Sequence, residues 1–357
     1  MKFSEHWEHR HREGSALHVT EGVNGQPSVN PHFRRKKRPA LTTAQYVEGI
    51  LAGDITVLSQ AITLVESNLP EHYEQAQEII ERCLPRSGNS VRIGITGVPG
   101  AGKSTFIEAI GNMVTSLGHR LAVLAIDPSS ERSGGSLLRG KTRTASPSAG
   151  SLGGVARKTR ETVILCEAAG FDTIFIETVG VGQSETAVHS MVDLFMLLQI
   201  SGAGDELQGI KRGIMEMADL VVITKADGEN IRKAELAKAQ ISNALHLFPE
   251  PESGCRPQVF TCSAVDGSGL SEIWKEVGDF IACTRRNGFF TSNRRRQNKY
   301  WMYETINEAL RNSFYRDPDI EAALPDFERK VLGDRLSSFV AARKLLDRYF
   351  GDIRREK

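Results

Sequence analysis

Apolar and polar positions repeat with two different periods along the chain, and the changes of period mark its organisation. Between about residues 91 and 284, short runs of Val, Ile, Leu and Phe alternate with amphipathic helical patterns such as 155–169 and 229–247. Continuous apolar runs separated by helices are typical of a parallel sheet covered on both faces. The sequence therefore predicts a doubly wound α/β fold with a mainly parallel sheet, whose strands are VRIGIT, LAVLAI, TIFIE, LFMLLQ, LVVIT and QVFTC.

Helical periodicity precedes this region. TTAQ at Thr42 can act as a capping box, and the segments YVEGILAG, DITVLSQAITLVES and EHYEQAQEIIERCL carry apolar residues at spacings of three and four. Pro70 and Pro85 bound the last of these segments. Residues 41–90 are therefore predicted to form a small helical subdomain in front of the α/β region at 91–284.

Helical periodicity also follows the α/β region. The Arg-rich stretch RRNGFFTSNRRRQNK is interpreted as a turn, and LGDRLSSFVAARKLLDRYF is predicted to form the last helix. Helices with a large apolar stripe and no following strand often close a dimer. Residues 285–357 are therefore interpreted as a helical dimerisation arm and the protein as a homodimer, the alternative being a helical pair folded back on its own sheet. The helix between these two segments carries Tyr303, Ile306, Leu310 and Phe314 on one face.

Residues 1–40 lack any apolar periodicity. They hold five of the nine histidines and the basic run RRKKR. Such a composition buries too little apolar surface to offset chain entropy, so a mobile N-terminal arm is predicted. A metal-binding tail, or a tail for an acidic partner, is the alternative.

Composition narrows the classes of partner. The 357 residues carry a formal net charge of +1, which disfavours non-specific nucleic-acid binding, and their 40% hydrophobic content is ordinary for a globular protein. The five cysteines are scattered without a CxxC pair, which indicates neither a disulfide framework nor a zinc site. No apolar run approaches the roughly 18 residues of a membrane span, and the N-terminus lacks the apolar core of a signal peptide. We expect a cytoplasmic protein with neither nucleic-acid nor membrane partners.

The first candidate chemistry follows the first predicted strand. GVPGAGKS satisfies the pattern GxxxxGK[ST], with a strand before it and an amphipathic helix after it. Its glycines allow backbone N–H groups to face phosphate oxygens, Lys103 would reach the terminal phosphates, and the Ser104 hydroxyl would coordinate Mg²⁺. A plain strand-to-helix turn has no use for a lysine and a hydroxyl there, so the fold is expected to be that of a P-loop NTPase. The predicted phosphate-binding residues are Gly97, Val98, Pro99, Gly100, Ala101, Gly102, Lys103, Ser104 and Thr105.

Two acidic residues end the next predicted strands. Asp127 closes LAVLAID and Glu177 closes TIFIE. Behind a phosphate loop, these carboxylates would hold Mg²⁺ together with Ser104, or orient the attacking water, although each alone could be a solvated loop acid or a helix cap. Lys103, Asp127 and Glu177 are accordingly the predicted catalytic residues.

VITKADG indicates which base is bound. Asp227 offers two acceptor oxygens that match the paired N–H donors of guanine, and the Lys225 stem can lie along the base plane. Adenine would leave that carboxylate unpaired, so GTP is favoured over ATP. In CSAVDGSG, the backbone N–H groups of Ser263, Ala264 and Val265 could cap the guanine carbonyl oxygen. The predicted ligands are therefore GTP or GDP with Mg²⁺.

These residues in this order, together with DPSSERSGG, SLGGVARKTRE, ETVGVGQSE and SGAGDELQGIKRGIMEMADLVVITKADG, closely resemble the methylmalonyl-CoA mutase-associated GTPases of the MeaB/ArgK type. The similarity runs from about residue 40 to the end. The resemblance implies a homodimeric G-protein chaperone that gates adenosylcobalamin delivery to its mutase, with slow GTP hydrolysis until the partner reorders the switches. It also makes four residues candidates for coupling the partner to the nucleotide: Gln183, Asp205, Glu206 and Lys211.

The chain departs from that family in one loop. In LLRGKTRTASPSAGSLGG, Gly140 stands where the family has an aspartate, Arg139 replaces the preceding glycine, and the segment is shorter. Losing a carboxylate beside the phosphates could weaken metal binding, or Arg139 could partly replace it. The sequence therefore predicts that nucleotide still binds, while hydrolysis or its coupling is altered.

Two other functions remain as alternatives. The His-rich start would suit a nickel-insertion GTPase, but such a protein needs a Cys/His cluster near the nucleotide, and the cysteines are scattered. A transport-linked kinase would require a phosphate-accepting partner and a preference for ATP, which Asp227 disfavours.

Overall fold

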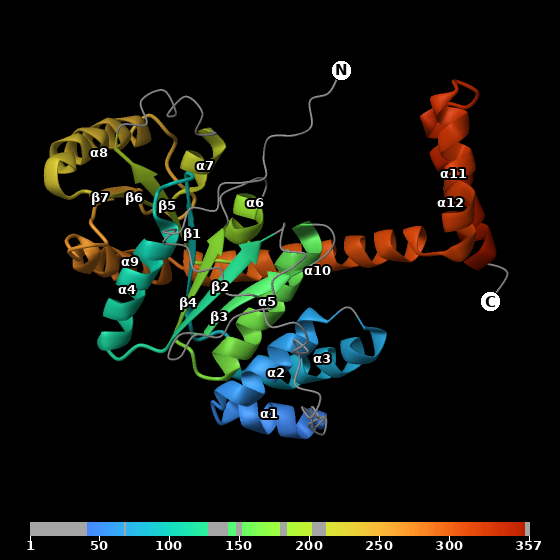
Figure 1. The fold of residues 1–357 in the computed structure, drawn as a ribbon, viewed down its shortest axis with the longest axis horizontal. Coiled ribbons are helices and arrows are strands. Elements are labelled where there is room, and N and C mark those ends of the chain that lie inside the picture. The colour runs from blue at the N-terminus through green and yellow to red at the C-terminus, as the bar shows by residue number, and fades with distance from the viewer. Residues whose placement is uncertain are drawn as a thin grey trace, which may run out of the picture. The chain divides into compact units, whose positions relative to one another are not determined.

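A parallel β-sheet forms the centre of the part of the chain that the computed structural model describes, residues 41–67, 69–127, 142–147, 152–178, 184–201 and 212–353. Seven strands of these residues pair in the order β3-β2-β4-β1-β5-β6-β7 (Figure 1). β2, β3 and β4 therefore lie on one side of β1, and β5, β6 and β7 lie on the other. Ligands of such sheets bind at the carboxyl ends of the strands where the strand order reverses, which here is at β1. The strands are β1 (Val91–Gly97), β2 (Leu121–Asp127), β3 (Thr142–Pro147), β4 (Thr173–Thr178), β5 (Leu194–Ile200), β6 (Leu220–Thr224) and β7 (Gln258–Thr261).

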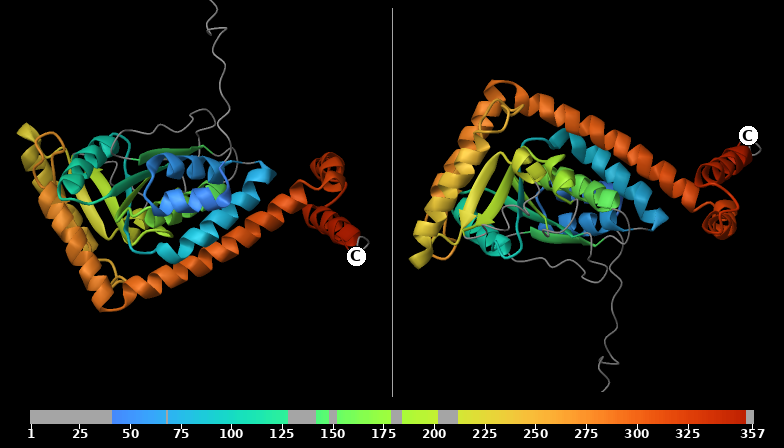
Figure 2. Two further views of the ribbon diagram at one scale, coloured as in Figure 1. Left: turned by 90° about the horizontal axis from the view of Figure 1, so that it is seen from below. Right: turned by 90° about the horizontal axis from the view of Figure 1, so that it is seen from above.

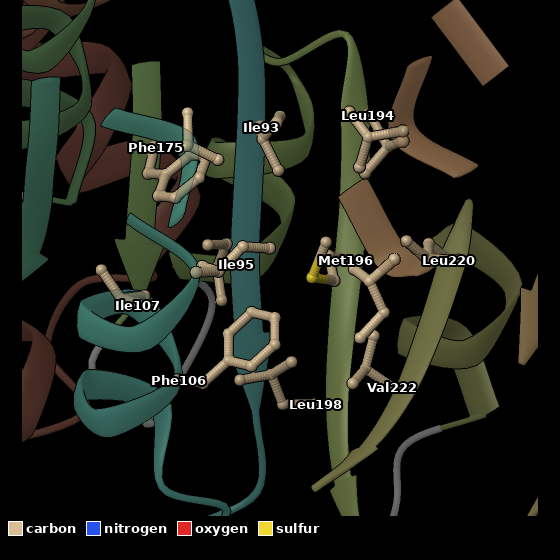
Figure 3. Packing of buried hydrophobic residues seen from close by; sticks show 14 of the residues in the cluster. Ile93, Ile95, Phe106, Ile107, Phe175, Leu194, Met196, Leu198, Leu220 and Val222 are labelled. Atoms are coloured by element: carbon tan, nitrogen blue, oxygen red, sulfur yellow. The ribbon is translucent and has the colours of Figure 1, made fainter. Parts of the chain in front are cut away.

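Helices cover both faces of the sheet, because side chains alternate in direction along each strand. On β5, Met196 and Leu198 pack with Phe106 of α4 in one core (Figure 3), whereas Leu197 packs with Ala234 of α8 in another. The predicted doubly wound α/β class is thereby confirmed. The helices next to the sheet are α4 (Lys103–Ser116), α5 (Leu152–Ala168), α6 (Ser184–His189), α7 (Arg212–Met217), α8 (Ile231–Leu245) and α9 (Leu270–Arg286).

Three helices precede β1, as the periodicity predicts. The capping box is present: the Thr42 side chain accepts the Gln45 N–H, and the Gln45 side chain accepts the Thr42 N–H. Asp54 caps the second helix in the same way, through the N–H groups of Thr56 and Val57. The helices are α1 (Thr43–Leu51), α2 (Ile55–Glu66) and α3 (Pro70–Cys83).

Three helices end the described chain. α10 (Phe289–Tyr315) begins directly after α9, at Gly288, where a φ of 81° permits the sharp change of direction that Figure 2 shows. α11 (Pro318–Leu332) and α12 (Ser338–Ile353) pack on each other around Ile320 and Leu345. Phe314 of α10 packs against this cluster, whereas Tyr303, Ile306 and Leu310 of the same helix are exposed.

One sequence-based expectation about these elements is wrong, and two elements were missed. The Arg-rich stretch taken for a turn is mostly helix, because its arginines are good helix formers and α10 starts at Phe289. α11 was not predicted, since its prolines interrupt the pattern. β3 was not predicted either, because TRTASP lacks an apolar run and pairs on one side only, with β2.

One cysteine pair also departs from expectation. Cys255 and Cys283 form a disulfide, although no disulfide was predicted. Cys255 lies in the loop before β7 and Cys283 lies on α9, so the fold joins residues whose sequence spacing gives no sign of proximity. Cys83, Cys166 and Cys262 are buried as free thiols.

Two further observations concern boundaries and membranes. Residues from Thr42 onward form one compact unit, and α9 runs across the boundary predicted at 284, while the predicted domain limits themselves stay predictions. None of the helices in the described ranges combines the length and hydropathy that a membrane span requires.

Candidate nucleotide-binding site

The loop between β1 and α4 closes on itself tightly enough to form a cradle. Gly102 holds a φ of 74°, which a side chain would strain. A Cβ on Gly97 would lie 2.6 Å from the Leu198 carbonyl oxygen, so only glycine lets β1 approach β5 this closely. Ala101 N–H donates to the Val98 carbonyl at 3.1 Å, which fixes the turn. The first helical turn then points its N–H groups toward the loop, the arrangement that binds phosphate.

Lys103 is held inside this loop. Its Nζ donates to the Gly97 carbonyl at 2.9 Å. Burial lowers the pKa of Lys103, while the charges of Glu177 and Glu185 act in the opposite direction. The ammonium therefore sits near two carboxylates in partly desolvated surroundings, where an added polyphosphate would interact strongly with it.

The predicted magnesium residues come from adjacent elements. β1 lies between β4 and β5, and its pairing aligns Ile95 with Glu177, so Glu177 ends its strand beside the phosphate loop. Asp127 ends β2, the neighbour of β4 on the other side, but its side chain lies outside the described residues. Ser104 lies in the exposed first turn of α4. The oxygen donors of Ser104 and Glu177 suit Mg²⁺, which prefers carboxylate, hydroxyl and phosphate oxygens.

Thr224 joins the phosphate loop to the base-binding strand, and sequence analysis did not single it out. Its buried hydroxyl lies 2.7 Å from the Ala101 carbonyl oxygen and 3.0 Å from the Gln199 carbonyl oxygen. It therefore ties the cradle to β5 and β6 together. Its place before Lys225 in TKAD was the signal that could have found it.

Lys225 adopts a left-handed backbone conformation, with a φ of 57°, which is unusual for a residue with a side chain. The Asn230 side chain supports it by donating to the Lys225 carbonyl at 2.6 Å. A Cβ built on Gly102 would be 3.9 Å from Lys225 Cε, so the aliphatic stem lies over the loop. This position leaves the stem available to cover one face of a bound base.

Asp227 is oriented by the loop after β7. The Ser263 hydroxyl donates to Asp227 Oδ2 at 2.8 Å, and no hydrogen bond from a described residue reaches Oδ1. Of the three predicted amides, Ser263 N–H donates to the Ser268 carbonyl and Val265 N–H donates to the Ser263 hydroxyl. Among the described residues, only the Ala264 N–H of this trio makes no hydrogen bond, so it is the amide best placed to meet a purine oxygen.

The predicted switch residues lie outside the described residues. This holds for Gln183, Asp205, Glu206 and Lys211, and also for Arg139 and Gly140 in the departing loop. Glu185, which sequence analysis did not single out, is 7% exposed on α6 and contributes to the electrostatic surroundings of Lys103.

Comparison with known proteins agrees with this geometry. The family model described as methylmalonyl Co-A mutase-associated GTPase MeaB matches residues 58–319. The chain belongs to this family. It is a P-loop GTPase, and the phosphate loop, the acidic strand ends and the base loop all fall within the matched residues.

Relatives of this MeaB-family GTPase match over most of its length. A probable GTPase of Mycobacterium tuberculosis is 48% identical over 310 residues, covering 84% of this chain and 92% of its own. The mitochondrial methylmalonic aciduria type A homolog of Mus musculus is 46% identical over 320 residues, covering 84% and 77%. A crystal structure of an LAO/AO transport system kinase is 36% identical with a TM-score of 0.70, covering 85% of this chain and 96% of that one.

Proposed function

We propose that this GTPase is a chaperone of an adenosylcobalamin-dependent mutase, methylmalonyl-CoA mutase or a relative of it. It would bind GTP, gate the loading of the cofactor into the mutase, and protect or reactivate the enzyme. The observation that carries the proposal is the family match over residues 58–319, whose description names association with that mutase. The name of the mouse relative, a methylmalonic aciduria type A homolog, supports the same pathway.

The residues of the site divide the chemistry between them. Lys103 and the loop amides would hold the β- and γ-phosphates, and Asp227 with the Ala264 N–H would select guanine. Ser104, Glu177 and Asp127 would hold Mg²⁺, which supplies charge neutralisation on the transferring phosphoryl group. These residues mainly position charge, so we expect GTP hydrolysis to be slow in the free protein. We expect a partner to accelerate it through Gln183, Asp205, Glu206 and Lys211.

A direct test compares nucleotides and then partners. We expect the purified protein to bind GTP roughly 100-fold more tightly than ATP, because adenine leaves a desolvated carboxylate unpaired. We also expect Mg²⁺-dependent GTP hydrolysis that rises when an adenosylcobalamin-dependent mutase is added. Equal affinity for ATP would favour the kinase alternative. Mutase that neither binds in any nucleotide state nor changes the GTPase rate would refute the chaperone role.

We also propose that the protein is a homodimer through its C-terminal helices. These helices expose large apolar side chains, including Leu310 at 61% and Phe339 at 86%. Isolated exposed apolar residues are common, but several on successive helices indicate a contact surface. We expect light scattering to give a dimer, and Leu310→Glu with Phe339→Glu to give a monomer that still binds GTP. A wild-type monomer at micromolar concentration would contradict this assignment.

The departing loop calls for its own experiment. Restoring the family aspartate by Gly140→Asp is expected to change the GTPase rate or its Mg²⁺ dependence, because a carboxylate is a ligand that Mg²⁺ prefers. The measurement is the steady-state GTPase rate across a Mg²⁺ titration, with Ser148→Asp as a matched added charge. An unchanged Mg²⁺ profile would show that the substitution in this chain has no metal-related consequence.

A further inference from the structure

A large cavity lies at the edge of the sheet opposite the phosphate loop. Its volume is about 930 Å³, within the range of roughly 300–1,000 Å³ that is usual for small-molecule sites. Asp193 and Asp219, which directly precede β5 and β6, and Gln258, which begins β7, all line it. Since the strands are parallel, these residues mark the amino ends of the strands. The cavity is therefore separate from the nucleotide site.

The walls are partly apolar, and most charges on them are already paired. Met215, Leu245, Phe248 and Phe289 supply the apolar surface. The two arginines of the cavity are both engaged in ion pairs. Arg256 lies 3.2 Å from Glu250, and Arg296 lies 2.6 Å from Glu252. Asp193 is likewise paired, with Arg294.

Asp219 is the exception. Its Oδ2 accepts the Phe195 N–H at 2.8 Å, but no hydrogen bond from a described residue reaches its Oδ1. Burial raises the pKa of Asp219 to about 7, with the hydrogen bond from Phe195 acting in the opposite direction. A partly desolvated carboxyl group with no cationic partner in the described part of the chain would interact strongly with a cation placed beside it.

Gln297 gives a second, independent indication. It lines the cavity at 4% exposure, and its Nε2 donates to the Val192 carbonyl at 2.7 Å. Its Oε1 is buried without a hydrogen-bond partner among the described residues. The Val192 carbonyl needs a donor, so the amide cannot be turned round to satisfy both groups. Asp219 Oδ1 and Gln297 Oε1 are thus two acceptors of the cavity lining that receive no hydrogen bond from a described residue.

We propose that this cavity binds a small organic cation, whose ammonium, amidinium or guanidinium N–H groups meet the Asp219 carboxylate and whose apolar part packs on Met215 and Phe248. The positive charge of the ligand follows from Asp219, because three other carboxylates of the described lining, Asp193, Glu250 and Glu252, already have an arginine partner. The size of the ligand follows from the volume of the cavity, and its N–H donors follow from the Asp219 oxygen that no described residue bonds. This site extends the proposed function and does not depend on it.

Benzamidine is a suitable probe, because it joins a planar amidinium to a flat apolar ring. Benzamide has the same shape without the charge. We expect calorimetry on the full-length protein to show saturable benzamidine binding, with benzamide at least about tenfold weaker, because a charge-assisted hydrogen bond is worth more than a neutral one. A crystal soaked with benzamidine should place the amidinium beside Asp219.

Two matched variants test whether benzamidine binding depends on the charge of Asp219. Asp219→Asn keeps an oxygen for the Phe195 N–H but removes the charge, and should weaken benzamidine at least about tenfold. Glu250→Gln removes a charge from the same cavity at a group already paired with Arg256, and should leave the affinity within about twofold. GTP hydrolysis should be unchanged in both variants.

Three results would overturn the proposal. They are equal affinity for benzamide and benzamidine, equal losses in Asp219→Asn and Glu250→Gln, and a crystal position away from Asp219. If Asp219→Asn fails to fold, the wild-type comparison of the two probes and the soaked crystal still decide the question. If the wild-type protein neither hydrolysed GTP nor bound a mutase, the proposed function would be refuted, but the proposal for this cavity would not.

Discussion

The charged groups around the phosphate loop and those around Glu167 are held in opposite ways. At the carboxyl edge, the Lys103 ammonium bonds to a backbone carbonyl and Asp227 keeps one oxygen free of described partners. Near the amino edge, Glu167 is fully enclosed: Arg92 donates to it twice, at 2.8 and 2.9 Å, and the Ser90 hydroxyl and the Gly88 N–H complete its partners.

This difference in hydrogen bonding separates a ligand site from a cluster that only holds the fold together. We call the cluster of Arg92, Glu167, Asp193 and Arg294 the structural joint. Asp193 accepts the Arg92 N–H from β1 and two bonds from Arg294 of α10, so the network fastens the C-terminal helices to the sheet. The Asp227 carboxylate retains an oxygen for a ligand, whereas the carboxylates of Glu167 and Asp193 accept all their printed hydrogen bonds from groups of the fold itself. Mutations at the two edges should therefore affect different measurements.

The largest effect is expected from Glu167→Gln. It leaves the buried Arg92 guanidinium without its counter-charge, which costs about 3–5 kcal/mol of unfolding free energy when one member of such a pair is removed. Burial alone would raise the pKa of Glu167, but the hydrogen bonds and charge of Arg92 hold it below its usual value, so the carboxylate is the form that the fold stabilises. Urea unfolding at pH 7 measures the loss.

The pairing of Glu167 with Arg92 also predicts how the unfolding free energy changes with pH. Because the pKa of Glu167 is lower in the folded state, its contribution is present above the ordinary carboxyl pKa and is lost as the pH falls through the folded value. Wild type should therefore lose its advantage over Glu167→Gln in acid. A constant difference from pH 7 to pH 3 would contradict this assignment.

A smaller effect, on binding only, is expected from Lys103→Ala. Losing a charge-assisted contact to phosphate should weaken GTP by about 2–3 kcal/mol, roughly 30- to 150-fold. The unfolding free energy of the free protein should change little, since the Lys103 ammonium bonds only to the Gly97 carbonyl in the described structure. Fluorescent GTP titration and urea unfolding on the same samples check both halves. Untouched affinity would remove the basis of the nucleotide site.

The contrast between the edges also explains what the sequence could predict. GVPGAGKS and TKAD are contiguous, and their spacing is fixed by the chemistry of one nucleotide, so the residues of that edge were found by pattern alone. The sheet followed from apolar runs such as LFMLLQ, because a strand covered on both faces is apolar throughout.

The structural joint could not be predicted in this way. Arg92, Glu167 and Arg294 are up to 202 residues apart, and each looks like an ordinary surface charge in its own segment. The edge strand β3 escaped for a related reason, since a strand paired on one side need not be apolar. The disulfide between Cys255 and Cys283 also depends on tertiary proximity.

Asp227→Asn should have a more selective effect at the carboxyl edge. An amide replaces one acceptor by a donor, so GTP should weaken by about 2 kcal/mol and xanthosine triphosphate, which carries a carbonyl in place of the amine, should improve. Competition binding with both nucleotides measures the exchange. Ser263→Ala, which removes only the hydroxyl that orients Asp227, serves as the control and should weaken both nucleotides together. A parallel loss for both in Asp227→Asn would place the base elsewhere.

The smallest effect is expected from Arg160→Met, at the edge where Glu167→Gln has the largest. Three arginines, Arg92, Arg160 and Arg294, surround the carboxylates of Glu167 and Asp193, so one positive charge is in excess. Burial and the neighbouring guanidinium groups lower the pKa of Arg160. Its Nη2 donates to Asn298 Oδ1, but its buried Nη1 has no partner among the described residues. Replacing a buried charge by an apolar side chain of similar length is often neutral or stabilising, so the unfolding free energy should change by no more than about 1 kcal/mol. If Arg160→Met lowered the unfolding free energy as much as Glu167→Gln does, Arg160 would be as essential to this cluster as Arg92. Its positive charge would then not be an excess charge.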